Sequence, residues 1–213
     1  MKIFEKNPPQ WEKSEILIEL EKFIILYQER PIKDNIYGMR FQHMFATYFI
    51  LKKLKPSFVI ESGVFKGQST WLIENTLPNS KILSIDINLD QRVYISKKAE
   101  YSNIDFKDQN FSNLPEDTLV FLDDHVNHYE RLKQAKFFNI KKLILEDNYS
   151  EKKGDFYTIN HAMNNKGFNH NYTKSSLLKT YFIFTNEFLK KLFYRRYFFK
   201  LNKINSRLRD YPP

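Results

Sequence analysis

Carboxylate side chains follow four short apolar runs of the sequence, and they are the first candidates for chemistry. The runs are Phe58–Ile60, Ile82–Ile85, Leu119–Leu122 and Leu143–Leu145, and the acids that follow them are Glu61, Asp86, Asp123, Asp124, Glu146 and Asp147. Ligands of an open α/β sheet bind beyond the carboxyl ends of its strands. If the runs form one parallel sheet, these acids line a ligand site.

A glycine-containing turn follows the first run. The segment ESGVFKGQST spaces Gly63 and Gly67 as Gly-x-x-x-Gly, and glycine lets a backbone bend and approach a ligand closely. This spacing is neither that of a dinucleotide-binding loop nor that of a Walker loop. It predicts a cofactor without a diphosphate, but a merely tight strand-to-helix connection would use the same glycines. Ser69 or Thr70 is expected to cap the helix that follows.

Asp86 decides between these two interpretations of the turn. It ends the second apolar run, nineteen residues after Gly67. At that place in adenosine-binding α/β folds a carboxylate accepts both hydroxyl groups of a ribose. The turn and Asp86 together therefore favour an adenosine-containing cofactor.

The elements that position these residues follow from the apolar periodicity. Two N-terminal segments have helical spacing, and the four apolar runs lack alternation, which is typical of parallel strands buried on both faces. We predict an α/β fold with a doubly wound, mostly parallel sheet preceded by N-terminal helices. The expected helices are Glu12–Tyr27, Arg40–Lys55, Ser69–Asn75, Asp90–Ser102 and Tyr129–Asn139, and the further expected strands are Ile104–Lys107 and Tyr181–Phe184.

Two segments resemble a known family. VIESGVFKGQSTW followed by ILSIDI is similar to motifs I and II of the class I S-adenosylmethionine-dependent methyltransferases. The resemblance implies a seven-stranded Rossmann-like sheet and S-adenosylmethionine as cofactor. It also implies that the glycine turn holds the methionine part, that Asp86 holds the ribose, and that a later acid contacts adenine. The implied cofactor-binding residues are Glu61, Gly63, Gly67, Ser69, Asp86 and Asp108.

The second half of the chain resembles the cephalosporin-hydroxylase-like and macrocin O-methyltransferase-like groups. LVFLDDHVNHYERL and KKLILEDNY place acids after the fourth and fifth strands as those groups do. In those groups the acids hold a divalent cation, which implies Asp123 or Asp124 with Glu146 and Asp147 here. The residue that usually separates the first two acids is missing from Asp123-Asp124-His125, so both aspartates stay candidates.

Electrostatics independently supports a cation at these acids. Carboxylates at adjacent strand ends repel one another and raise one another's pKa unless a cation neutralises them. Oxygen ligands suit Mg²⁺. Helix caps or solvated loop acids are the simpler alternative.

Asp124 and His125 are the candidate catalytic residues. An imidazole, whose ordinary pKa is about 6.5, suits a general base that takes a proton from a substrate hydroxyl. A structural histidine bonded to its own loop is the alternative for His125. The other histidines, His43, His128, His161 and His170, are expected at the surface.

Charge is unevenly distributed along the chain. The whole net charge of +9 lies in residues 166–213, where 11 basic residues accompany two acidic ones. The neutral remainder argues against a nucleic-acid partner. Aromatic and basic residues interleave in the tail, which therefore either packs on the core or on a second subunit, or contacts an anionic membrane surface.

The length of 213 residues predicts one structural domain. We expect an N-terminal helical cap at residues 1–55, an α/β core at 56–185 and a basic aromatic tail at 186–213. The sequence has no cysteine, no secretory pattern and no apolar run of about 20 residues, which together favour the cytoplasm.

Two functions remain open on the sequence alone. The first is a metal-assisted O-methyltransferase that acts on a small-molecule or sugar hydroxyl. The second is a binding or scaffolding protein that keeps the fold without transfer activity. Nucleic-acid methylation is disfavoured by the neutral body and by the lack of an Asn-Pro-Pro-Tyr-like or catalytic-cysteine signature.

Overall fold

The computed structural model describes residues 11–149, 154 and 156–163. The chain divides into two compact units. Of the described residues, the sheet unit contains 11–124 and Leu132–Glu146, and the second unit contains His125–Arg131 and those from Asp147 onward. Among the described residues, no helix is both long enough and apolar enough to cross a membrane.

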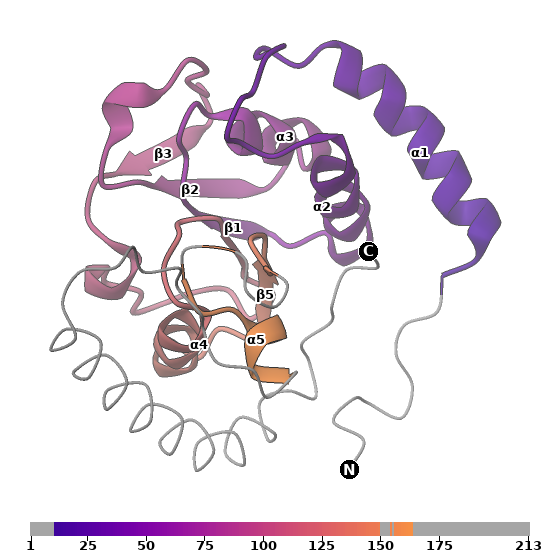
Figure 1. Ribbon diagram of the computed structural model, residues 1–213. Coiled ribbons are helices and arrows are strands. Elements are labelled where there is room, and N and C mark those ends of the chain that lie inside the picture. The colour runs from indigo at the N-terminus through magenta and orange to yellow at the C-terminus, as the bar shows by residue number, and fades with distance from the viewer. Residues whose placement is uncertain (1–10, 150–153, 155, 164–213) are drawn as a thin grey trace, which may run out of the picture. The chain divides into compact units, whose positions relative to one another are not determined.

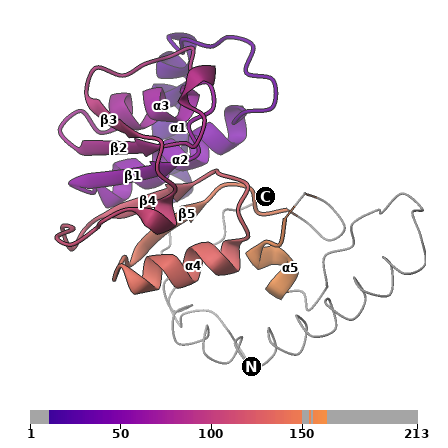
Figure 2. The same cartoon turned by 90° about the vertical axis from the view of Figure 1, so that its left-hand side faces the viewer.

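The sheet unit is built on a sheet in which every neighbouring pair of strands is parallel. The strands are β1 (Phe58–Ser62), β2 (Lys81–Ile85), β3 (Ala99–Ser102), β4 (Leu119–Leu122) and β5 (Lys142–Leu145). Their order in the sheet is β3-β2-β1-β4-β5 (Figures 1 and 2). The strand order reverses direction at β1 and β4, which is the arrangement of a doubly wound α/β sheet.

Helices cover both faces of this sheet. One face packs against α1 (Lys13–Gln28), α2 (Phe41–Leu54) and α3 (Gln68–Thr76). The other face packs against the 3₁₀ turn Phe106–Asp108 and the sheet-unit part of α4 (His128–Phe137). Because the central strands are buried on both sides, they read as continuous apolar runs rather than as alternating ones.

Most predicted elements are confirmed by the structure. The two N-terminal helices, the helix after the glycine turn, the helix after β4 and the four apolar strands all form within a few residues of their expected bounds. Five strands are described, all within the expected doubly wound sheet. The expected strand Tyr181–Phe184 and the tail lie outside the described residues.

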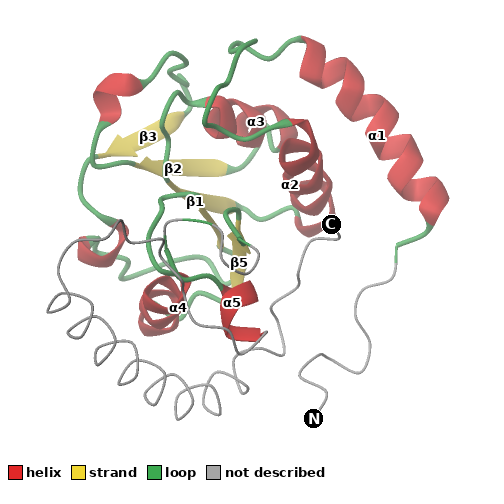
Figure 3. Cartoon of the chain, viewed as in Figure 1, coloured by secondary structure: helices red, strands yellow, loops and turns green. Residues whose placement is uncertain are grey.

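Two predictions between β2 and β4 are wrong. The expected helix Asp90–Ser102 is a 3₁₀ turn (Leu89–Gln91), a loop and strand β3, and the expected strand Ile104–Lys107 gives way to the 3₁₀ turn Phe106–Asp108 (Figure 3). Local side-chain bonds to the backbone explain the first result. The Ser96 hydroxyl accepts hydrogen bonds from the backbone N–H groups of Lys98 and Ala99, and such bonds compete with helix formation.

Helix α5 (Ile159–Met163) belongs to the second unit. Two buried histidines organise the described part of this unit. His128 Nδ1 accepts a hydrogen bond from the Ile159 backbone N–H, and His161 Nδ1 accepts one from that of Thr158. The expectation that His128 and His161 lie at the surface is therefore wrong, since their exposed fractions are 3% and 1%.

Phe23 is the anchor of α1 on the sheet unit, which gives a first prediction. Its ring is fully buried among the rings of Tyr27, Phe41, Phe45 and Tyr48. We expect Phe23→Ala to lower the free energy of unfolding by about 3–5 kcal/mol, because it removes apolar contacts and leaves a cavity. Urea unfolding followed by circular dichroism measures this change.

The matched control for this substitution is Phe137→Ala. Phe137 lies in α4 and is 83% exposed, so its truncation should change stability by less than about 0.5 kcal/mol. Equal losses in the two variants would contradict the assignment of Phe23 as the anchor.

Candidate functional site

The glycine turn after β1 lies where two backbone segments approach very closely. Gly63 has a φ of +98°, and a β-carbon on it would lie 1.9 Å from the carbonyl oxygen of Asp123. Gly67 has a φ of +88°, and a β-carbon on it would lie 2.4 Å from the carbonyl oxygen of Tyr94. Both positions therefore require glycine for packing and for backbone conformation, whatever the ligand.

Asp86 connects the end of β2 to this turn. Its Oδ2 accepts hydrogen bonds from the backbone N–H groups of Val64 and Phe65 at 2.8 and 2.9 Å, and its Oδ1 accepts one from Asn88 at 2.9 Å. An ionised carboxylate offers about four acceptor sites. Asp86 therefore fixes the turn and keeps capacity for about one further hydrogen bond.

Glu61 is buried completely beneath the turn. Its Oε2 accepts hydrogen bonds from the hydroxyls of Thr70 and Ser84, each at 2.6 Å. Burial raises the pKa of Glu61 above its ordinary value of 4.5, the hydroxyls of Ser69, Ser84 and Thr70 oppose this, and the negative charge of Asp86 adds to it. Glu61 thus fastens β1 to β2 and α3 from inside the sheet unit.

The expected side-chain cap of α3 is wrong. The helix begins after Gly67, which provides no side-chain hydrogen bond, and the Thr70 hydroxyl bonds to Glu61 instead. Ser69 and Thr70 are both buried. Their hydroxyl groups hydrogen-bond to the Glu61 carboxylate instead of capping the helix. An unpaired carboxylate in the interior costs more free energy than an unpaired N–H group that water can reach.

Asp108, predicted to contact adenine, ends the 3₁₀ turn after β3. Its side chain is exposed, and its Oδ2 lies 3.9 Å from the Lys107 Nζ. In the part of the chain that the structure describes, the Asp108 carboxylate accepts no hydrogen bond from the glycine turn. Its role toward a cofactor stays a prediction.

Two of the predicted metal ligands are engaged within the sheet unit. Asp124, just beyond β4, accepts a short hydrogen bond from the Ser62 hydroxyl at the end of β1. Glu146, just beyond β5, forms a short ion pair with His43 Nδ1 of α2. The backbone hydrogen bonding of the sheet continues one residue beyond β4 and β5. The Asp123 N–H donates to the Ser62 carbonyl, and the Glu146 N–H donates to the Leu122 carbonyl.

His43 and Ser62 are residues that the sequence interpretation missed. His43 was expected at the surface, and its ring is indeed 59% exposed, but it is paired with Glu146, whose side chain is only 7% exposed. The two residues are 103 positions apart. No local pattern predicts such a pair, because it depends on α2 reaching the carboxyl end of β5.

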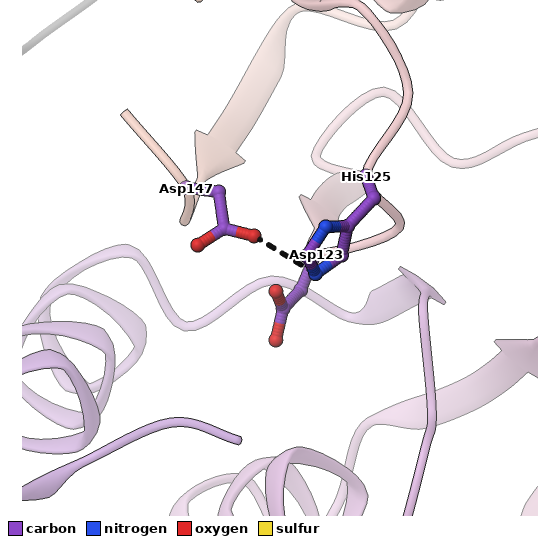
Figure 4. A group of neighbouring side chains, drawn as sticks. All are labelled: Asp123, His125 and Asp147. Atoms are coloured by element: carbon purple, nitrogen blue, oxygen red, sulfur yellow. Dashed lines mark ion pairs between the residues drawn. The ribbon is translucent and has the colours of Figure 1, made fainter. Parts of the chain in front are cut away.

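The second unit holds two further predicted residues, His125 and Asp147. His125 Nε2 lies 3.3 Å from Asp147 Oδ2, as the dashed line in Figure 4 shows. His125 has a φ of +54°, a conformation that is uncommon for a residue other than glycine. Its ring also packs edge-on against Phe156. His125 is thus oriented by a carboxylate and by an aromatic ring.

Comparison with known proteins gives similar solved structures. No protein-family model and no curated protein matches the chain. A structure of CmcI with SAH is 15% identical, has a TM-score of 0.45, and is matched over 68% of this chain and 80% of that chain. An SAH-bound methyltransferase from Podospora anserina is 15% identical, with a TM-score of 0.44 over 68% of this chain and 65% of that chain.

A methyltransferase from Geobacter sulfurreducens is 16% identical, with a TM-score of 0.43 over 65% of this chain and 71% of that chain. Because these TM-scores lie below 0.5, the fold assignment rests on the order and register of the five strands.

The raised pKa of Glu61 gives a prediction for stability against pH. The folded state holds the Glu61 proton more tightly than the unfolded state does, so stability falls as pH rises from about 4.5 through the folded pKa. Glu61→Gln should remove this fall, since the neutral amide oxygen can still accept from Thr70 and Ser84. Free energies of unfolding of both proteins between pH 4.5 and 8 measure it.

In that experiment, the difference in stability between Glu61→Gln and the wild type should shift in favour of the variant as pH rises. A difference that is constant over the whole range would mean that Glu61 does not titrate on unfolding, and would contradict the prediction. Asp90→Asn, which alters an exposed acid after β2, serves as the control.

Proposed function

We propose that this chain is an S-adenosylmethionine-dependent methyltransferase. The observation that supports it most is the connection of Asp86 to the glycine turn through two backbone hydrogen bonds. This connection lies beside the point where the strand order reverses, which is where doubly wound folds bind nucleotides. Asp86 supplies an acceptor for a ribose hydroxyl there, and the turn lacks a diphosphate-binding pattern.

The proposed acceptor is a hydroxyl group of a small molecule or a sugar. A transfer enzyme must hold this hydroxyl in line with the cofactor's methyl group, and positioning of that kind supplies much of the rate. His125 is the proposed general base, because its imidazole is already oriented by Asp147. Asp124, whose carboxylate accepts a hydrogen bond from the Ser62 hydroxyl, is the second proposed catalytic residue, and it would act as a candidate ligand of a cation.

We further propose that acids after β4 and β5, namely Asp123 or Asp124 together with Glu146 and Asp147, bind a divalent cation such as Mg²⁺. The donor set fits this ion, since carboxylate oxygens are the ligands that Mg²⁺ prefers and the chain has no cysteine. A bound cation would lower the pKa of the acceptor hydroxyl. His43 pairs with Glu146, a carboxylate that the cation would use.

Titration calorimetry with S-adenosylhomocysteine tests the cofactor proposal. We expect the wild-type chain to bind, and Asp86→Asn to bind about tenfold or more weakly, because a hydrogen bond to a charged acceptor contributes about 1.5–3 kcal/mol. Asp90→Asn should bind like the wild type. Because Asp86 also holds the glycine turn, the free energy of unfolding of each variant is measured alongside.

Two outcomes would contradict the cofactor proposal. One is a wild-type chain that neither releases heat nor shifts its unfolding temperature at millimolar ligand. The other is an Asp86→Asn variant that stays folded and binds as tightly as the wild type. Binding without methyl transfer to any hydroxyl acceptor would favour the scaffolding alternative.

Titration with Mg²⁺ tests the metal proposal in the absence of any cofactor. Glu146→Gln should weaken binding, because it removes a charged ligand. His43→Gln should strengthen it by up to about fivefold, because the exposed imidazole no longer competes for Glu146. The control is Lys81→Gln, which alters an exposed basic residue at the amino end of β2, opposite the edge that carries the acids. Equal affinities in the wild type, Glu146→Gln and His43→Gln would exclude Glu146 as a ligand.

A further inference from the structure

The glycine turn, residues 63–67, is held from a second side as well as by Asp86. The Lys66 carbonyl accepts hydrogen bonds from the backbone N–H groups of Val93 and Tyr94 at 3.0 and 2.9 Å. The Asp86 carboxylate accepts the N–H groups of the two residues before Lys66. Three consecutive residues of the turn are therefore fixed by one short segment of the chain, which runs from Asp86 to Tyr94.

This segment, which we call the 86–94 loop, is also closed on itself. The Asn88 N–H donates to the Asp86 carboxylate, and the N–H and Nε of Arg92 both donate to the Leu89 carbonyl. Both ends of the loop meet the glycine turn. A loop of this length whose ends are close together and whose own contacts fill it is a compact unit. The 86–94 loop therefore supports the turn as one body.

The backbone of the glycine turn requires such support. Gly63 and Gly67 have φ values of +98° and +88°, and Phe65 between them has a φ of +47°. A positive φ is unfavourable for a residue with a β-carbon, and it persists only where the surrounding structure enforces it. A turn that is held on one side alone could relax, whereas contacts on both sides keep it in one conformation.

Tyr94 connects the 86–94 loop to helix α3. Its hydroxyl donates a hydrogen bond of 2.8 Å to Glu74 Oε2, and the Glu74 side chain is only 13% exposed. Burial, this hydrogen bond and the negative charge of Glu74 raise the pKa of Tyr94 above its ordinary value of 10, so the hydroxyl keeps its proton. The Tyr94 carbonyl oxygen lies against Gly67, where a β-carbon would be 2.4 Å away.

We propose that Tyr94 is a positioning residue for the cofactor, an inference that rests on the methyltransferase function proposed above. Its hydroxyl bond to Glu74 keeps the backbone of Val93 and Tyr94 against the Lys66 carbonyl. This contact holds the glycine turn in the conformation that the cofactor would bind, from the side opposite to Asp86. A site that is ordered before its ligand arrives loses less free energy on binding. Tyr94 therefore raises affinity without touching the cofactor.

Titration calorimetry of the full chain with S-adenosylhomocysteine tests the effect on affinity. Tyr94→Phe keeps the ring and removes only the hydroxyl. It should bind about three- to tenfold more weakly than the wild type, because only a fraction of the free protein then presents the competent turn. Tyr48→Phe is the matched control, since it removes a tyrosine hydroxyl bond to another glutamate, Glu19, between α2 and α1. It should bind like the wild type.

Amide hydrogen exchange without ligand separates positioning from a general loss of stability. The N–H groups of Val93 and Tyr94 report on the contact directly, because both donate to the Lys66 carbonyl. Tyr94→Phe should speed exchange at these two amides by about tenfold relative to the amides of β1, since it favours local opening. Tyr48→Phe should leave that ratio unchanged. Added S-adenosylhomocysteine should slow both amides again in Tyr94→Phe.

Substitutions of Glu74 test whether the hydroxyl bond carries the effect. Glu74→Ala should weaken binding as much as Tyr94→Phe does, and the double variant should bind no more weakly than either, because both remove the same interaction. Glu74→Gln should bind within about twofold of the wild type, since its amide oxygen still accepts from the Tyr94 hydroxyl.

The results distinguish this role from the proposed function. A wild-type chain that binds S-adenosylhomocysteine, together with a Tyr94→Phe variant that binds equally well, would overturn the role of Tyr94 and leave the function intact. Equal exchange in Tyr94→Phe and Tyr48→Phe, or additive losses from Tyr94→Phe and Glu74→Ala, would do the same. A wild-type chain that binds no S-adenosylhomocysteine would overturn the proposed function and the role of Tyr94 with it.

Discussion

The close approach of the Asp123 carbonyl to Gly63 constrains the carboxyl edge of the sheet more than any other contact. β1 and β4 are neighbours in the sheet, and the chain leaving β4 crosses directly over the residue that leaves β1. Only a residue without a side chain leaves room for this crossing. The crossing fixes the positions of Asp123 and Asp124 after β4. The Ser62 hydroxyl at the end of β1 then donates a hydrogen bond to the Asp124 carboxylate. The positions of the candidate ligands thus depend on a backbone contact.

Beneath this edge, Glu61 shows how a polar group is accommodated in the interior. A buried carboxylate is costly unless hydroxyl donors surround it, and Ser69, Thr70 and Ser84 supply them from α3 and β2. All three are buried, Ser69 and Thr70 in α3 and Ser84 in β2. Asp86 is half-buried at the carboxyl edge of the sheet, where its carboxylate accepts hydrogen bonds from backbone N–H groups of the glycine turn. Glu61 and Asp86 follow similar apolar runs but have different roles. Glu61 connects elements inside the fold, and Asp86 fixes the glycine turn at the sheet edge.

The sequence predicted the strands, the helices on either side of them and the acids at the strand ends, because burial on both faces leaves a plain signal in the residue types. It failed where local side-chain bonds decide the structure, as at Ser96, whose hydroxyl replaces a helix by a turn and an edge strand. It also failed for His43, whose partner Glu146 is distant in the chain. Contacts of that kind are set by the packing of whole elements, which residue periodicity does not encode.

Helix α2 illustrates how far that packing reaches. Its C-terminal end leads into β1, so its N-terminal end points toward the carboxyl edge of the sheet. There His43 pairs with Glu146 after β5, while the next residue, Met44, accepts a weak hydrogen bond from Gln68 at the start of α3. One turn of α2 therefore contacts the ends of both the glycine turn and β5. Residues before β1, which carry no recognisable motif, consequently shape the same edge that the motifs of the sheet define, and differences in this helix would alter the edge without changing the sheet.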